Sequence, residues 1–308
     1  PREPGHARAL HGGACVSAVR VVDPGPLTLV QDLGRPGLAS LGVSASGTFD
    51  RAAHRLANRL VGNDENAAAL ECLLGGLRLA LPAGTWFAVT GAWSDAVLVT
   101  DGRRTRLEPH TAMQADADAE LHLGSVTHGL RSTVAVRGGL AVPAALGSRA
   151  RDTLAGLGPE PLRAGDVLPL GPEPSSPVPE GDLVPVDPPT DGVVELGVRP
   201  GPRHDWFDAA AWSLLLTSEG ITSARSDRTG VRLEGPALER VPDLVGVELA
   251  SEGMLRGSIQ VSPDGAPTVL GPDHPVTGGY PVIAVVVDAS LDRLAQLRPG
   301  QPVRLRLV

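Results

Sequence analysis

The stretch LECLLGGLRLALPAG, residues 70–84, contains two short apolar runs on either side of a Gly-Gly pair, and a Pro-Ala-Gly turn ends the second run. The same pattern continues as far as Val142 in four more short runs, each of which ends at a glycine: WFAVTG, AVLVTDG, AELHLG and STVAVRGG. Short apolar runs separated by turn residues are typical of β-strands joined by tight connections. We therefore predict a mainly β fold with few helices.

The composition agrees with this prediction. The 308 residues include 38 glycines and 29 prolines, which suit many tight turns, and 42% of them are hydrophobic. Aromatic residues make up only 3% and the net charge is −8, which argues against a nucleic-acid-binding surface. No apolar run approaches the ~20 residues of a membrane span, and no secretory signal is visible. Two cysteines in a chain of this length point to a reducing compartment, so we expect a cytoplasmic protein.

The chain contains no lysine, because all 27 basic residues are arginines. It therefore has no Walker A lysine, no lysine for a Schiff base and no lysine to carry biotin. If ATP or biotin takes part in the chemistry, another polypeptide must supply those groups. Anion binding in this chain must rely on arginine, backbone N–H groups and helix N-termini.

The chain divides into four predicted segments. Residues 1–17 are polar and rich in glycine, which predicts a disordered lead-in. Residues 18–170 form a first β domain, residues 171–192 a Pro-rich linker, and residues 193–308 a second β domain in which the strand pattern restarts, with LVGVELAS at residues 244–251 among its strands. Similar Gly/Pro turns open and close the two domains, which indicates either a duplication or a chance match.

One helix is predicted clearly, over residues 48–62. Its apolar positions recur with helical spacing on one face: Phe49, Ala52, Ala53, Leu56 and Leu60. Thr48 can cap its first turn, Asp50 suits the positive end of the helix dipole, and Gly62 can end it.

Several blocks of the sequence, in the same order from about Val21 to the C-terminus, resemble the family of allophanate hydrolase subunit 2, which is also called the biotin-dependent carboxyltransferase family or the family of the 5-oxoprolinase C subunit. The first half carries QDLGRPGLASLGVSASGTFD and ANRLVGNDENAAALECLLGG. The second half carries PGPRHDWF, SARSDRTGVRLEGP, SEGMLRGSIQVSPDG and DHPVTGGYPVIAVVVDASLDRLAQLRPG. The resemblance implies two cyclophilin-like β-barrel halves that work with a cyclophilin-like partner of the subunit-1 type, and with a lactam-hydrolase subunit, as a hetero-oligomer.

The resemblance implies three alternative functions. The first is the C subunit of an ATP-dependent 5-oxoprolinase, a hydrolase that opens the cyclic amide of pyroglutamate and is active only with its partner subunits. The second is the carboxyltransferase part of a urea-type carboxylase, and the third is a non-enzymatic regulator that binds a subunit-1 partner. Hydrolysis of allophanate itself requires a Ser-Ser-Lys arrangement, which a chain without lysine cannot provide. We expect no covalently bound cofactor, ATP only at the level of the complex, and biotin only on another chain.

In the first half, the candidate site residues follow the turn of residues 31–37. Arg35 could hold a substrate carboxylate or phosphate beside Gln31, and Asp32 could transfer a proton; the alternative is a structural turn with an Asp–Arg pair. Ser46, Gly47 and Asp50 precede the helix, where free N–H groups favour an anion, unless they serve only as caps. Asp50 is also a candidate for proton transfer.

The second half offers a similar set of candidates. Proton transfer is assigned to His204 and Glu252, and ligand binding to these residues: Arg203, Asp227, Arg228, Gln260, His274, Thr277, Gly278, Gly279 and Tyr280. For Arg203 and His204 the alternative is a solvated loop, and for Tyr280 it is a tyrosine at the edge of the core. No pair of histidines or cysteines has the spacing of metal ligands, so we predict no metal site. Glu71 lies in a Leu-rich run and needs a buried partner, for which arginine is the best candidate.

Overall fold

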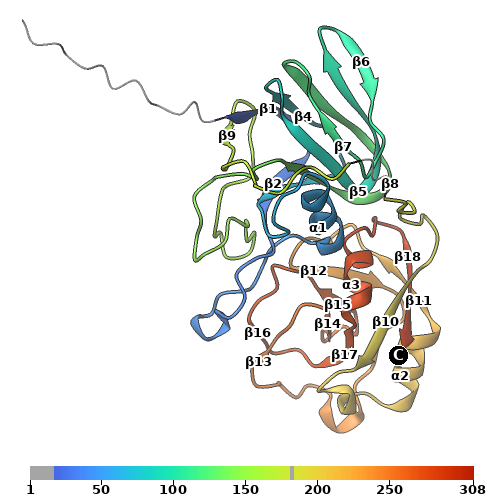
Figure 1. Cartoon of the computed structure of the whole chain (residues 1–308). Coiled ribbons are helices and arrows are strands. Elements are labelled where there is room, and N and C mark those ends of the chain that lie inside the picture. The colour runs from blue at the N-terminus through green and yellow to red at the C-terminus, as the bar shows by residue number, and fades with distance from the viewer. Residues whose placement is uncertain (1–16, 181–183) are drawn as a thin grey trace, which may run out of the picture.

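The computed structural model describes residues 17–180 and 184–308 (Figure 1). All but one residue of the expected lead-in, residues 1–17, and part of the expected linker, residues 171–192, lie outside the described residues. The predicted mainly β fold with short helices is confirmed. Among the described residues, no helix is long and apolar enough to cross a membrane.

The first half is built on one nine-stranded sheet. The strand order is β2-β3-β8-β4-β1-β9, and β5 pairs with β6, β7 and β8. The strands are β1 (Ala18–Pro24), β2 (Leu27–Gln31), β3 (Ala69–Leu73), β4 (Leu77–Leu81), β5 (Trp86–Thr100), β6 (Arg103–Arg106), β7 (Ala112–Gln114), β8 (Ala119–Val136) and β9 (Val167–Pro169). The antiparallel pair of β5 and β8 is the longest in the fold, and in Figure 1 it extends upward with β6 at its end.

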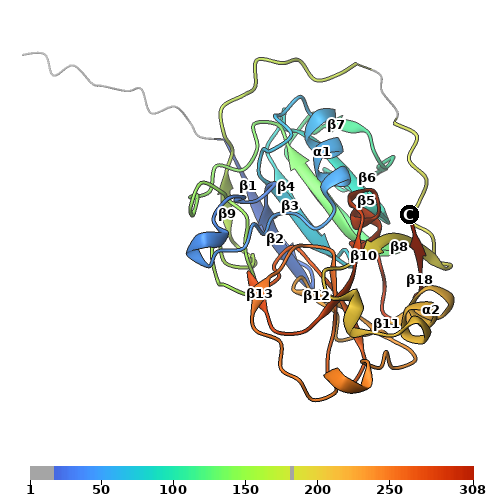
Figure 2. The ribbon, with the colours of Figure 1, turned by 90° about the horizontal axis from the view of Figure 1, so that it is seen from below.

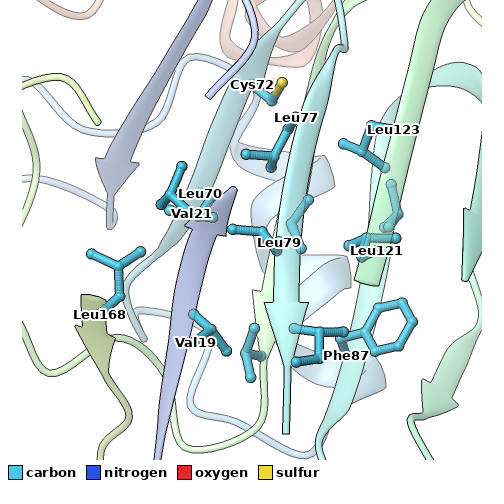
Figure 3. Close-up of a cluster of buried hydrophobic side chains, with 14 of the residues drawn as sticks. Val19, Val21, Leu70, Cys72, Leu77, Leu79, Phe87, Leu121, Leu123 and Leu168 are labelled. Carbon is cyan, nitrogen blue, oxygen red and sulfur yellow. The ribbon is translucent and has the colours of Figure 1, made fainter. Parts of the chain in front are cut away.

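The quoted stretch at residues 70–84 forms β3 and β4, as predicted. Leu77, Leu79 and Leu81 are buried while Arg78 and Ala80 between them are partly exposed, which is the alternation expected when one face of a strand covers a core. Figure 3 shows Leu77 and Leu79 among side chains of β1, β3, β8 and β9. The core therefore consists mainly of aliphatic side chains, with Phe87 as a buried aromatic ring.

The second half is a closed barrel of seven strands in the order β10-β17-β14-β15-β12-β11-β18, and a parallel pairing of β10 with β18 closes it. Its strands are β10 (Val194–Pro200), β11 (Glu219–Thr222), β12 (Gly230–Glu234), β14 (Ser258–Val261), β15 (Pro267–Leu270), β17 (Val282–Val286) and β18 (Pro302–Leu307), and β13 (Glu252–Gly253) pairs separately with β16 (Thr277–Gly278). Two helices, α2 (Ala209–Thr217) and α3 (Asp288–Leu294), pack on the barrel, and the short 3-10 turns are η1 (Ala39–Leu41), η2 (His204–Trp206) and η3 (Pro242–Leu244). The strand predicted at residues 244–251 is wrong, because that segment is an exposed loop.

The predicted helix is α1 (Arg51–Leu60), and its start needs a correction. Asp50 is the N-cap and accepts a hydrogen bond from the Ala53 amide at 2.8 Å, whereas the Thr48 hydroxyl donates to Glu71. The predicted apolar face is wrong in part, because the helix buries the polar side chains of His54 and Asn58. These two bond to each other, and Asn58 also donates to the Ala67 carbonyl, so their burial leaves the Asn58 amide satisfied.

The two halves are joined at α1 and α3, which lie one above the other in Figure 1. The Arg51 amide at the start of α1 donates to Asp292 of α3 at 2.9 Å. Phe49, just before α1, is fully buried within the hydrophobic cluster of the second half. Figure 2 shows the described parts of the Pro-rich segment running along the outside of the first half toward β10. The halves therefore contact each other through side chains, in addition to being linked by the connecting segment.

Candidate functional site between the two halves

A buried ion network occupies the junction. The Arg228 guanidinium, 4% exposed, contacts Glu71 of β3 and donates to Asp273 at 2.8 and 3.0 Å. Burial is the largest single influence and would raise the pKa of each carboxyl, but the Arg228 charge and the hydrogen bonds to each carboxylate together lower the pKa of Glu71 and Asp273. Arg131 of β8 adds a second cation, 3.8 Å from Glu71. The arginine partner predicted for Glu71 is confirmed.

The segment before α1 is held by this network. The Ser46 hydroxyl donates to Asp273 at 2.6 Å, the Gly47 carbonyl accepts from Arg228 at 2.6 Å, and the Phe49 amide donates to Glu71 at 2.6 Å. Gly47 has φ 93°, and a side chain there would meet the backbone of Leu33 and Gly34. The segment is therefore fixed in the orientation that presents Asp50 at the junction.

Asp32 and Arg35 do not pair with each other in the structure. The Asp32 carboxylate accepts from the Gly34 amide at 2.8 Å, from the Ser148 hydroxyl at 2.6 Å and from the Arg149 amide at 2.6 Å. The buried Arg35 side chain donates to the carbonyls of Ala145 and Ala150. Both residues thus attach the turn of residues 31–37 to the loop of residues 145–151, as does Gln31 through its bond to the Arg151 carbonyl at 2.9 Å.

Asp50 lines a cleft of about 520 Å³ at the junction. Burial raises its pKa to about 6, although the Ala53 amide and the Gln296 side chain both donate to the carboxylate and oppose the shift. The Gln296 amide nitrogen lies 2.6 Å from Asp50. A carboxyl group with a pKa close to neutral can both give and take a proton at physiological pH, which is the property of a general acid or base.

The walls of this cleft come from both halves. Leu56 of α1 and Val184 of the segment before β10 supply apolar surface, and His110, Gln296 and Gln301 supply polar groups. Two exposed cations, Arg59 and Arg293, are also part of the lining. Asp187 and Asp292 line the cleft as well, so it combines apolar walls, neutral polar groups and charges of both signs.

A second group of predicted site residues lies away from this cleft, on the second half. Arg203 forms an ion pair with Glu252, which lowers the pKa of the Glu252 carboxyl. The His204 ring bonds to the Gly201 carbonyl at 3.0 Å. Tyr280, 47% exposed, and Gly279 line a separate hollow of about 890 Å³ beside the loop of residues 244–249.

The remaining candidates are distributed between these places. Asp227 accepts from the amides of Thr229 and Gly230 and shapes the turn before β12. Thr277 and Gly278 form β16, and Gly278 lies against the Gln260 side chain, which is bonded to Met254. His274 is buried next to Asp273 and bonds to the Pro275 carbonyl at 2.8 Å. The structure thus brings Ser46, Gly47, Asp50 and Arg228 together and leaves Arg203, His204, Glu252 and Tyr280 elsewhere.

Sequence reasoning missed four residues of the junction: Arg131, Asp273, Gln296 and His110. Asp273 and Gln296 both fall inside the block DHPVTGGYPVIAVVVDASLDRLAQLRPG, which carried the resemblance, but neither has a neighbour along the chain that indicates its role. Gln296 accepts from the amides of Leu130 and Arg131 and donates to Asp50, more than 160 positions away in each case. Contacts of this range leave no signal in local spacing.

Comparison with known proteins gives a consistent result. Residues 41–307 match the family described as carboxyltransferase domain, subdomain A and B. The chain is 38% identical over 294 residues to the C subunit of 5-oxoprolinase from Escherichia coli, and the match covers 92% of this chain and 89% of that one. It is 32% identical to the C subunit of 5-oxoprolinase from Haemophilus influenzae, with 94% and 91% of the two chains covered.

Solved structures show the same relationship. The urea carboxylase of Kluyveromyces lactis matches with a TM-score of 0.87 and 30% identity over 95% of this chain, but this region is only 27% of that larger chain. The protein TTHA0988 matches with a TM-score of 0.83 and 34% identity over 95% of this chain, which spans 56% of it. The present chain therefore corresponds to one part of these longer proteins.

Proposed function

This chain belongs to the family of carboxyltransferase domains with subdomains A and B, and on that premise we propose that it is the C subunit of a multi-chain 5-oxoprolinase, which opens pyroglutamate to glutamate with ATP. The similarity to the C subunits of two bacterial 5-oxoprolinases supports the proposal, since it covers about nine tenths of each of those chains, 89% and 91%. Both relatives are subunits, so the active enzyme would contain partner chains.

The structural observation that carries the proposal is the pairing of Asp50 with Gln296 in the cleft between the halves, at 2.6 Å. Opening a lactam requires attack of water on the carbonyl carbon, rupture of the C–N bond and delivery of a proton to the departing nitrogen. A carboxyl group whose pKa is about 6 can take the proton of the water and return one to the nitrogen. We assign this proton transfer to Asp50.

Gln296 has the role of positioning Asp50 in this scheme. Its oxygen accepts from two backbone amides of β8 and its nitrogen donates to the carboxylate, so the amide orientation is fixed by the first half. The carboxylate is also anchored as the N-cap of α1. A catalytic group that is held from two sides keeps its geometry while the substrate changes charge.

The other predicted site residues receive different roles in this proposal. Arg228, Asp32 and Arg35 have polar contacts inside the protein and position the segment that carries Asp50. Contact with the substrate carboxylate falls to the exposed Arg59 and Arg293 at the cleft. The chain has no lysine, so ATP binding through a Walker A lysine would belong to a partner subunit.

The proposal is tested by co-expressing the chain with its partner subunits and measuring ATP-dependent formation of glutamate from pyroglutamate. The variant Asp50→Asn keeps the size and the capping oxygen of the side chain but cannot transfer the proton. We expect it to lower kcat by roughly 100-fold or more. Asp116→Asn, at an exposed position outside the cleft, is the matched control and should leave kcat within twofold. Full turnover by the wild-type chain without partners would contradict the assignment of this chain as one subunit of a complex.

A second candidate function is carboxyl transfer in a biotin-dependent urea-type carboxylase. The observation in its favour is the likeness to the urea carboxylase of Kluyveromyces lactis at a TM-score of 0.87. Biotin would then arrive on a carrier chain, since this chain has no lysine to hold it. Urea-dependent ATP hydrolysis by the complex together with a biotinylated carrier, in the absence of pyroglutamate turnover, would favour this function over the first.

A further inference from the structure

His110 differs from the other buried histidines of the described chain. Its side chain is 3% exposed, yet neither ring nitrogen has a hydrogen-bond partner among the described residues. By contrast, the buried rings of His54 and His274 each bond through one nitrogen, to Asn58 and to the Pro275 carbonyl. Buried polar groups in folded proteins are nearly always hydrogen-bonded, so a ring without any partner calls for an explanation.

The position of His110 places this ring at the cleft. It lies in the connection between β6 and β7 with φ 60°, a left-handed conformation that non-glycine residues seldom adopt, and its own amide donates to Val89 of β5 at 3.0 Å. The residue is part of the lining of the 520 Å³ cleft, together with Asp50 and Gln296. The fold thus places a residue with an unpartnered imidazole in the lining of the cleft.

The surroundings keep the imidazole neutral. Burial lowers the pKa of His110, and the adjacent ring, with centroids 6.3 Å apart, is the uncharged indole of Trp93. A neutral imidazole has one N–H donor and one acceptor nitrogen. The indole N–H of Trp93 is also buried without a partner among the described residues. His110 and Trp93 are therefore neighbouring uncharged side chains whose ring N–H and nitrogen groups have no partner among the described residues.

We propose that His110 contacts the ligand of this cleft and that the ligand is a small compound with an amide or ureido group, an inference that rests on the proposed function and extends it to a named recognition residue. The neutral imidazole has one donor and one acceptor nitrogen without partners, and these match the C=O and the N–H of such a compound. A phosphate or a free carboxylate would instead need cations, which in this cleft are the exposed Arg59 and Arg293. Leu56 and Val184 provide the apolar surface that suits the carbon atoms of a small ring.

The inference is tested by two measurements on the complete chain and on its complex with the partner subunits. In the chain with 15N-labelled histidine, 5-oxo-L-proline and urea are titrated separately while the ring nitrogen resonances of His110 are followed by NMR. L-Proline, which lacks the amide carbonyl, is the control compound. In the complex, calorimetry gives the Kd of each compound for wild type, His110→Ala and His122→Ala.

We expect a shift of the His110 ring resonances with 5-oxo-L-proline but not with L-proline, and a Kd at least tenfold weaker in His110→Ala. His122→Ala should bind like wild type, because His122 pairs with Glu120 on the sheet of the first half, outside the cleft. The inference would be overturned if none of the compounds shifts the ring resonances of His110. It would also be overturned if His110→Ala binds the compounds with wild-type affinity. A shift with urea alone supports the role of His110 and contradicts the 5-oxoprolinase proposal, whereas pyroglutamate turnover that is indifferent to His110→Ala contradicts only the role of His110.

Discussion

Arg228 is a charged side chain in a place that is almost free of water, and it is tolerable there because Glu71 and Asp273 balance it. Burial favours the neutral form of the guanidinium, but the two carboxylates outweigh that effect and raise the pKa of Arg228. The group also donates to the Gly47 carbonyl, so each of its terminal nitrogens and Nε has a partner. Removal of this one side chain would leave Asp273 without its counter-charge and Glu71 with Arg131 alone, 3.8 Å away.

We therefore expect Arg228→Met to lower the free energy of unfolding by about 3–5 kcal/mol. The matched control is Arg304→Met, which breaks an exposed pair with Glu219 and should cost less than about 1 kcal/mol. Urea-induced unfolding of both variants measures the difference. Equal losses would show that the buried network contributes no more than a surface ion pair.

Asp50 gives a second prediction, on the pH dependence of stability. Its folded-state pKa of about 6 lies above the ordinary value of 3.8, so the folded chain holds this proton more tightly than the unfolded chain. The contribution is fully present below pH ~4 and is lost as pH rises through about 6. The penalty at pH 7 is on the order of 3 kcal/mol. Asp50→Asn should therefore become more stable relative to wild type by about this amount between pH 4 and pH 7.

Chemical unfolding of the two proteins at several pH values measures this change, with Asp116→Asn as the control at an exposed position. A stability difference between Asp50→Asn and wild type that stays constant across this range would mean that the carboxyl titrates normally.

At the scale of single residues, the sequence predicted a contact correctly where its cause lies in residues nearby along the chain. A carboxylate in an apolar strand, Glu71, had to have a cationic partner, and a carboxylate before a helix, Asp50, had to interact with its free amides. The bonds from Ser46 to Asp273 and from Gln296 to Asp50 span 227 and 246 positions, and no pattern of spacing predicts them. Whether the predicted site residues contact substrate stays a prediction.

Among the elements, β5 is the strand that shapes the cleft. Its pairing with β8 shifts register between Gly91 and Ala96, which is the signature of bulges that bend a strand. Gly91 lines the cleft, and its φ of 86° is one that glycine adopts without strain. A Cβ at this position would lie 2.6 Å from the Arg131 carbonyl and 3.3 Å from the Gln296 side chain.

Substitution of two glycines with similar φ separates the steric cost of an added methyl group from the cost of the backbone conformation. Gly84 has φ 83° but open space around the missing side chain, so Gly84→Ala should cost about 1–2 kcal/mol for the conformation alone. Gly91→Ala should cost clearly more, because the methyl group also collides with the backbone of β8. Thermal unfolding of the two variants measures the difference, and equal shifts in Tm would refute a tight contact at the bulge.

Strands were easier to predict than the details of helices. Alternating burial in β4 follows directly from the leucines at every second position of LRLAL. The predicted apolar face of α1 is wrong in part because His54 and Asn58 are buried as a hydrogen-bonded pair. A pattern of hydrophobic residues cannot predict the burial of such a polar pair. The predicted strand at residues 244–251 is wrong because the segment is a loop: Val245 and Val247 are 68% and 41% exposed, and only Leu244 and Leu249 pack partly against the core.

At the scale of the whole molecule, the two halves contact each other through a buried aromatic ring and through hydrogen bonds. Phe49 of the first half packs in the core of the second, with the Arg131 guanidinium 4.5 Å from the centre of its ring. Arg298 of the second half donates to the Gly129 and Val126 carbonyls of β8. Because separation of the halves would expose these groups together, we expect the described chain to unfold in a single cooperative transition.

Gln296 is the residue whose loss should weaken this cooperativity most selectively. Gln296→Ala removes two acceptor contacts to the amides of Leu130 and Arg131 and the donor contacts to Asp50 and the Arg131 carbonyl, so it leaves buried backbone groups of the first half unpaired. The matched control is Gln301→Ala, because Gln301 is equally buried, at 7% exposure, but bonds to Thr190 and Gly192 of the connecting segment.

In scanning calorimetry, wild type and Gln301→Ala should give a calorimetric enthalpy equal to the van't Hoff enthalpy. In Gln296→Ala the calorimetric enthalpy should exceed the van't Hoff value, since one half then unfolds before the other. A single unchanged transition in Gln296→Ala would mean that the hydrophobic contact at Phe49 couples the halves without help from this amide.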